Sequence, residues 1–149
     1  MSAHSKVDLF VHFVWSTAGR RKVLLPQFIE AVHAAAAAGC RHERCEPLVI
    51  GGVEDHVHAL VRLRATSIPA RVVGVMKVFS SREAAVRSGI ERFHWQAGYG
   101  AFSLSSEDVA SVANSLRRQR EQHARNALVA HLEWDDGVTA PPEVGRRPF

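Results

Sequence analysis

Two histidines separated by one valine, His56-Val57-His58, are the residues of this chain whose types and spacing best suit shared chemistry. They lie in the run VEDHVHALVRL, whose β-branched and apolar content predicts a strand. Side chains two residues apart on a strand point to the same face, so both imidazoles leave one side of a sheet. That spacing suits a shared metal ion. The opposite face would then carry the apolar residues Val57, Ala59, Val61 and Leu63.

A second candidate surface lies on the predicted last helix, which runs from Glu107 to about Leu132. An apolar stripe at helical spacing is formed by Val109, Val112, Ala113 and Leu116. Ser111, Ser115 and Gln119 recur at i, i+4 and form a separate polar stripe. From the pattern alone, this stripe is either a solvated helix face or the side of the helix that faces a site.

The elements that must position these residues follow from periodicity, caps and turn residues. Strands are predicted over 7–15, 48–53, from His56 onward and over 93–104, with a tight turn near Glu54-Asp55. The first helix is expected to open at Pro26 and to stop at Gly39, and the second to run from an N-cap at Ser67 to about Ser88. The order β-α-β-β-α-β-α predicts an α+β fold. It is a ferredoxin-like split β-α-β antiparallel sheet with helices on one face and an extra C-terminal helix.

Length and composition favour one domain with a full core. The chain has 149 residues, 46% of them hydrophobic, and a formal net charge of +4. We expect a single domain over 1–132 and a loosely ordered, Pro/Gly-rich tail over 133–149. No run is long and apolar enough to span a membrane and no apolar signal core opens the chain, so a cytoplasmic protein is expected. The basic charge weakly favours an acidic polymer such as nucleic acid. Cys40 and Cys45 are interpreted as reduced thiols, with a disulfide as the alternative.

Three motifs, in chain order, carry a resemblance to a known family. VHFVWST at 11–17 is followed by a basic loop, His56-Val57-His58 comes next, and WQAGYGAFSLS at 95–105 precedes a helix that contains Gln119. Together they resemble the single-tyrosine HUH transposases, the small transposases of bacterial insertion sequences, to which the REP-associated tyrosine transposases are related. The resemblance covers about residues 7 to 126. It implies binding of single-stranded or hairpin DNA at insertion-sequence ends, and a homodimer with composite active sites.

The resemblance also implies roles for individual residues. His56 and His58 match the paired metal ligands, and Gln119 matches the third ligand, supplied by the last helix. The implied cofactor is a divalent metal, Mg2+ or Mn2+. The family reaction is metal-dependent cleavage and rejoining of a DNA strand through a phosphotyrosine link.

The sequence departs from the family where the nucleophile is expected. That position, four residues before Gln119, is Ser115, and the only tyrosine, Tyr99, lies in the GYGAF run. A phenol is a far better leaving group from phosphate than an aliphatic hydroxyl, and serine is also shorter. The interpretation we favour is DNA binding without covalent chemistry, either in an impaired transposase or in a non-catalytic regulatory protein derived from one. The alternatives are chemistry by Ser115 or a metal-bound water, and Tyr99 as a substitute nucleophile.

Several further residues receive roles that the structure can test. The resemblance implies phosphate contacts at two places: Arg20, Arg21 and Lys22 in the loop, and Arg117 and Arg118 in the last helix. From the sequence alone, a solvated loop and ion pairs of the helix arginines with Glu121 are the alternatives. Asp55 is read first as a turn residue and second as a partner that orients His56. His12 is expected to be a satisfied histidine, either in the core or on the sheet face.

Overall fold

Four antiparallel strands form one sheet in the order β2-β3-β1-β4 in the computed structural model, which describes residues 4–118. The strands are β1 (Leu9–Ser16), β2 (Glu46–Val53), β3 (His56–Leu63) and β4 (Gly100–Leu104). This order, with the two central strands flanked by β2 and β4, is the one that a split β-α-β pattern produces. The predicted α+β fold is therefore confirmed.

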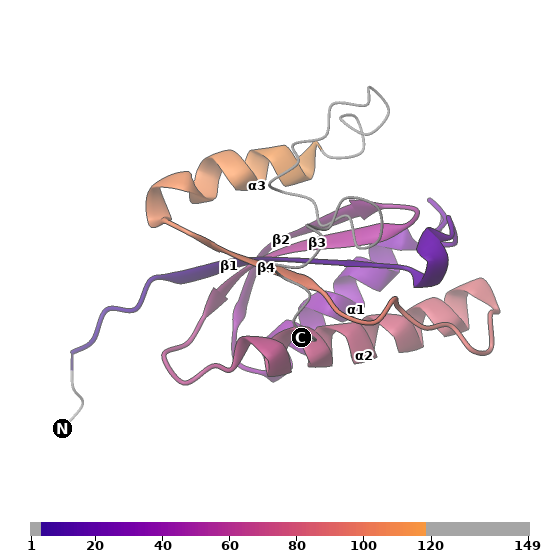
Figure 1. Ribbon diagram of the computed structural model, residues 1–149, viewed down its shortest axis with the longest axis horizontal. Helices are drawn as coiled ribbons and strands as arrows, with labels where there is room; N and C mark the ends of the chain where they lie inside the picture. The colour runs from indigo at the N-terminus through magenta and orange to yellow at the C-terminus, as the bar shows by residue number, and fades with distance from the viewer. Residues whose placement is uncertain (1–3, 119–149) are drawn as a thin grey trace, which may run out of the picture.

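The helices lie on both sides of this sheet (Figure 1). Helices α1 (Ile29–His42) and α2 (Pro69–Ser88) cover one face, and α3 (Val109–Arg117) lies across the other. Two short 3-10 turns complete the described chain: η1 (Ala18–Arg20) follows β1, and η2 (Ser106–Asp108) leads into α3. Because β4 runs antiparallel to β1 and α3 then turns back, α3 points toward the end of the sheet where β1 ends and β3 begins.

The alternation of side chains along β3 divides the core between the two faces. Val57, Ala59, Val61 and Leu63 join the main core with α1 and α2, as the sequence predicted. On the other face, Leu60 packs against three buried residues of α3, which are Val112, Ala113 and Leu116. The apolar stripe predicted for the last helix is thus confirmed, and its burial holds α3 against the sheet beside the histidines.

Helix α1 does not stop at Gly39, as its glycine suggested, but continues to His42. The glycine is needed for helix packing instead. A Cβ built at Gly39 would lie 2.9 Å from the Met76 Cα and 3.0 Å from the Val75 carbonyl oxygen, both on α2. The two helices approach so closely that only a hydrogen atom fits between them.

The predicted helix starts also shift. Pro26 lies in a turn, and α1 begins at Ile29 after Phe28. Helix α2 begins at Pro69, with Ile68 as its N-cap and no side-chain cap, so Ser67 is not the capping residue. The Ser67 hydroxyl accepts a hydrogen bond from the Arg64 backbone N–H at 2.9 Å, which closes the loop before the helix.

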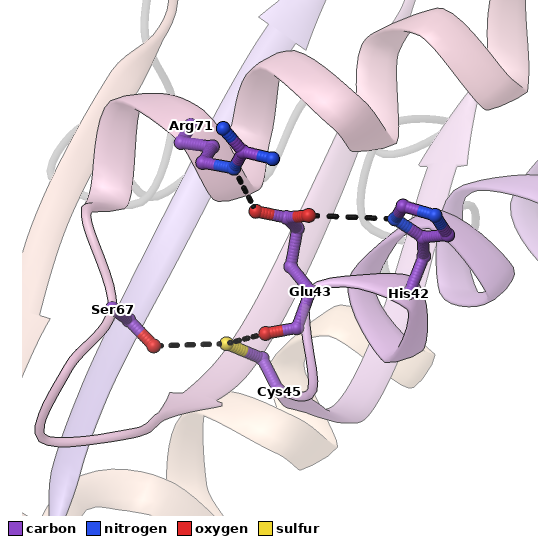
Figure 2. Close-up of polar contacts among 5 residues, drawn as sticks. All are labelled: His42, Glu43, Cys45, Ser67 and Arg71. Atoms are coloured by element: carbon purple, nitrogen blue, oxygen red, sulfur yellow. Dashed lines mark hydrogen bonds and ion pairs between the residues drawn. The ribbon is translucent and has the colours of Figure 1, made fainter.

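A polar cluster ties the end of α1 to the start of α2 (Figure 2). The Arg71 Nε donates to the Glu43 carboxylate at 2.6 Å, and the other Glu43 oxygen lies 3.4 Å from the His42 Nδ1. The bond from Arg71 holds the pKa of the Glu43 carboxyl below its usual range. Beside it, Cys45 Sγ lies 3.2 Å from the Ser67 hydroxyl. All of these atoms pair within the cluster, so we assign it a structural role.

The predicted strand over 93–104 is regular only from Gly100 onward. The preceding segment turns toward α2, where the Lys77 ammonium donates to the backbone oxygens of Gln96 at 3.0 Å and Gly98 at 2.8 Å. Gly98 takes a left-handed conformation, with φ of 89°. Trp95 keeps one isolated bridge, to Thr17, and its indole N–H donates to the Lys77 carbonyl oxygen at 2.9 Å.

Two further expectations concern the cysteines and membranes. Cys40 and Cys45 are both buried and form no disulfide, as expected for reduced thiols. Burial raises the pKa of the Cys40 thiol to about 12. None of the helices in the described part of the chain is long and apolar enough to cross a membrane. The predicted domain end at residue 132 and the tail over 133–149 lie outside the described residues.

Candidate metal and DNA site

His56 and His58 lie on the same face of β3, as their spacing predicted. Their ring centroids are 5.0 Å apart, and the ring planes stand at 77° to one another. His58 is fully buried, and His56 is 3% exposed. On the neighbouring strand β1, the residues opposite them are Val14 and Ser16. The strand register therefore brings the two imidazoles together beneath α3 without any help from a loop.

Each imidazole is held through its Nδ1 atom. His56 Nδ1 lies 2.6 Å from the Asp55 Oδ1, and His58 Nδ1 lies 2.7 Å from the Nε2 of His12 on β1. Buried ring nitrogens need such partners, because an unsatisfied polar atom in the interior is costly. A metal ion shared by His56 and His58 would be bound through their Nε2 atoms. These two nitrogen donors fit two of the ligand positions of a metal site.

The turn before β3 is anchored to the loop after β1. The Thr17 backbone N–H donates to the Asp55 carbonyl oxygen at 2.8 Å, and the Leu24 N–H donates to the Glu54 carbonyl oxygen at 2.9 Å. At Gly52, on β2 opposite Val57, φ is 150°, and a Cβ there would collide with the His56 carbonyl oxygen. The close pairing of β2 and β3 beside the histidines therefore requires glycine at position 52.

Helix α3 places the predicted nucleophile position near this face but off its apolar stripe. Ser115 is half-buried, between the buried Ala113 and Leu116, while Ser111 is exposed. Arg117 and Arg118, at the end of the helix, are exposed. The predicted third ligand, Gln119, follows directly and lies outside the described residues. Within residues 4–118, no three His, Cys, Asp or Glu side chains group into a metal site.

In the basic loop, one arginine forms an ion pair and the two other cations are exposed. Arg20 Nη2 lies 3.6 Å from the Asp55 Oδ2, whereas Arg21 and Lys22 are exposed. The Gln96 side-chain oxygen accepts the Gly19 N–H at 3.1 Å, so the WQAGYG run supports this loop. A pocket of about 50 Å³ opens between the loop and the segment over 90–94, and its basic lining residues are Arg21, Arg92 and His94.

His12 is the member of the site that sequence reasoning placed on the sheet but did not connect to the histidine pair. It is wholly buried and contacts His58 across the β1–β3 pairing. The available signal was the register of two antiparallel strands, which would have put positions 12 and 58 on one face. The length of the turns on either side was not certain enough in the sequence to give that register.

Comparison with known proteins identifies the family. A sequence profile of the family "Transposase IS200 like" matches residues 5–136, which is most of the chain. A comparison with curated proteins gives no match.

Two solved structures share the fold. One is a proposed transposase from Deinococcus radiodurans R1, with a TM-score of 0.64 and 17% identity, over 85% of this chain and 96% of that one. The other is the REP-associated tyrosine transposase bound to a REP hairpin, with a TM-score of 0.60 and 14% identity, over 95% of this chain and 96% of that one. The histidine pair, the fold around it and the profile match agree, and the chain belongs to the family of IS200-like transposases.

Proposed function

We propose that this protein binds single-stranded or hairpin DNA at insertion-sequence ends through a site that retains the metal-binding histidine pair of the family. The observation that carries the proposal is the pair of imidazoles on β3, each held through Nδ1 and 5.0 Å apart between ring centroids. His56 and His58 would supply two nitrogen ligands. Gln119, which follows Arg118 directly and lies outside the described residues, would supply the third.

The chemistry of the pocket suits a DNA phosphate. A divalent metal, Mg2+ or Mn2+ in this family, would stabilise the negative charge that develops on the phosphate oxygens during strand cleavage. The exposed cations Arg21, Lys22, Arg117 and Arg118 would hold the flanking phosphates.

Ser115 stands where the family places its tyrosine nucleophile, and we propose that strand cleavage is impaired for that reason. The serine hydroxyl is shorter than a phenol and is a poorer leaving group when the phosphate link reverses. No His, Asp or Glu within the described residues of α3 lies beside it to act as a base. The protein would be either an impaired transposase or a DNA-binding regulator derived from one. By resemblance it would act as a homodimer.

Incubation with a hairpin-ended oligonucleotide and Mn2+ separates these functions. The proposal predicts a gel shift with neither a nicked product nor a protein–DNA adduct. A covalent adduct with the unaltered protein would show that it retains the covalent strand cleavage of a transposase. A nicked product without an adduct would support a metal-dependent phosphodiesterase that uses water. The absence of a shift with hairpin DNA would contradict DNA binding itself.

Metal binding by the histidine pair has a separate test. His56→Ala should abolish Mn2+ binding measured by calorimetry, because it removes one of two histidine ligands. His94→Ala, an exposed histidine without ligand spacing, is the matched control and should bind Mn2+ as the unaltered protein does. An unchanged titration for His56→Ala would contradict the metal site.

A further inference from the structure

The hydrogen bonds behind the histidine pair form two separate supports, one from the turn before β3 and one from β1. We propose that Asp55 with Arg20, and His12 from β1, are positioning residues that fix the tautomers of His56 and His58 so that both Nε2 atoms face one metal ion. This inference rests on the proposed metal site and adds to it the residues that make the two imidazoles competent ligands. Ligand histidines in general donate their second ring N–H to a carboxylate or another acceptor.

The first support has a defined direction. An ionised carboxylate only accepts hydrogen bonds, so at 2.6 Å from Asp55 the Nδ1 of His56 must carry the hydrogen. The neutral imidazole then keeps its lone pair on Nε2, which is the atom that a metal would bind. Two backbone bonds hold the Asp55 turn, from Thr17 and Leu24, so the turn that carries the carboxylate is held in the absence of a ligand. Preorganisation of this kind lowers the cost of binding.

Arg20 extends the first support by one residue. Its guanidinium lies 3.6 Å from the second carboxylate oxygen of Asp55. The residue also holds a left-handed backbone conformation, with φ of 53°, which is uncommon for a side chain of this size. Strain of this kind persists where surrounding contacts fix it. The ion pair assigns Arg20 to the support of Asp55 and leaves Arg21 and Lys22, both exposed, as the loop's DNA contacts.

The second support is a bond between two imidazoles. The ring planes of His12 and His58 lie within 15° of each other, with centroids 4.9 Å apart and a nitrogen–nitrogen distance of 2.7 Å. Near-parallel planes at this short nitrogen distance indicate a hydrogen bond in the plane of the rings and not face-to-face stacking. Either ring could donate. Only donation from His58 Nδ1 to His12 Nε2 leaves the lone pair of His58 on Nε2, so the inference requires His12 to be the acceptor.

Nitrogen-15 NMR of the metal-free protein reads the two tautomers directly. The inference predicts hydrogen on Nδ1 in His56, His58 and His12 when the rings are neutral. Hydrogen on Nε2 of His58 would overturn it. This measurement uses the unaltered chain and needs no metal, so it tests the supports even if the proposed metal site fails.

Mn2+ calorimetry on matched variants supplies the second readout. His12→Phe and Asp55→Ala should each weaken Mn2+ binding about 10–100-fold, the usual effect of removing a partner of a ligand histidine. His12→Gln and Asp55→Asn, which restore an accepting oxygen, should recover most of the affinity. Arg20→Gln should weaken Mn2+ binding, and Arg87→Gln on α2, where the arginine pairs with Glu83, should not.

The possible results distinguish the two proposals. Loss of Mn2+ binding in His56→Ala with unchanged affinity in His12→Phe and Asp55→Ala would refute the supports and keep the metal site. No Mn2+ binding by the unaltered protein would refute the metal site, and the NMR tautomers would then decide the supports alone. Equal losses in the Ala or Phe variants and in their Gln or Asn counterparts would also refute the hydrogen-bonding role, because restored acceptors would then have no effect.

Discussion

Tyr99 packs edge-on against Phe13, with ring centroids 6.3 Å apart and ring planes at 73°. Phe13 pairs with Ala59 on the sheet face that α1 and α2 cover, and Tyr99 joins that core. His58 points to the other face, beneath α3. Within one chain, the only tyrosine is therefore separated from the histidine pair by the sheet, which argues against its use as a substitute nucleophile.

Removing the Tyr99 hydroxyl should leave function unchanged. We expect Tyr99→Phe to keep its dissociation constants for Mn2+ and for hairpin DNA within about twofold of the unaltered protein, the range of a change remote from a site. Calorimetry and fluorescence anisotropy measure the two constants. If the unaltered protein formed a covalent DNA adduct and Tyr99→Phe did not, the tyrosine would be the nucleophile after all.

The packing of α1 against α2 predicts opposite effects for two helical glycines. Gly39→Ala should lower the free energy of unfolding by about 1–3 kcal/mol, since its Cβ meets α2 backbone atoms that cannot move aside alone. Gly74→Ala has no atom within 4 Å of its new Cβ and should raise stability by about 0.5–1 kcal/mol through helix propensity. Urea denaturation measures both. Equal effects would contradict the close helix approach.

Gly39 also shows where sequence reasoning on the fold stops. The apolar alternation of 56–63 and the stripe of the last helix gave the right faces, because burial follows periodicity. The glycine was interpreted from local preference as a helix end, but its reason lies on another helix, in the backbone at Met76. Ser67 was assigned to the helix cap by the same local logic, and a loop bond to Arg64 occupies it instead.

Partly buried His33 should make stability depend on pH. Burial lowers the pKa of His33 from 6.5 to about 4, and its Nε2 has no hydrogen-bond partner in the described chain. His33 in the unfolded chain therefore binds a proton below about pH 6.5, whereas His33 in the folded protein stays neutral until about pH 4. The free energy of unfolding should fall as the pH drops through this window, by up to about 3 kcal/mol.

His33→Gln isolates this effect, because glutamine does not titrate and suits a helix. Urea denaturation at several pH values should show a flatter dependence between pH 6.5 and pH 4 for this variant. His94→Gln, at an exposed position, should keep the slope of the unaltered protein. An identical slope in His33→Gln would show that another group causes the acid sensitivity.

Exposed cations in the basic loop should contribute to DNA affinity through phosphates. Arg21→Gln and Lys22→Gln should each weaken hairpin DNA binding for all sequences alike. Each should also reduce the slope of log affinity against log salt concentration by about 1. Anisotropy titrations over a range of salt concentrations measure this slope. Arg87→Gln on α2, where the arginine pairs with Glu83 at 2.7 Å, is a charge-matched control expected to change little.

The parts of the candidate site that depend on local geometry could be predicted from the sequence, and the parts that depend on distant contacts could not. The shared face of His56 and His58 was predicted because a two-residue spacing on a strand fixes one face. His12 and Arg20 were not connected to the pair, because their roles depend on strand register and on a left-handed loop residue that no local pattern specifies. Asp55 was read first as a turn residue, and the structure shows that it is both a turn residue and the partner of His56.

A covalent-adduct assay decides whether the histidine pair belongs to a strand-transfer site that lacks its nucleophile. The assay compares Ser115→Tyr with the unaltered protein and with the double variant Ser115→Tyr/His56→Ala. Each protein is incubated with a labelled hairpin-ended oligonucleotide and Mn2+ and run on a denaturing gel. We predict an adduct for Ser115→Tyr only. An adduct with the unaltered protein, or none with a Ser115→Tyr variant that still binds Mn2+ and DNA, would contradict the proposal.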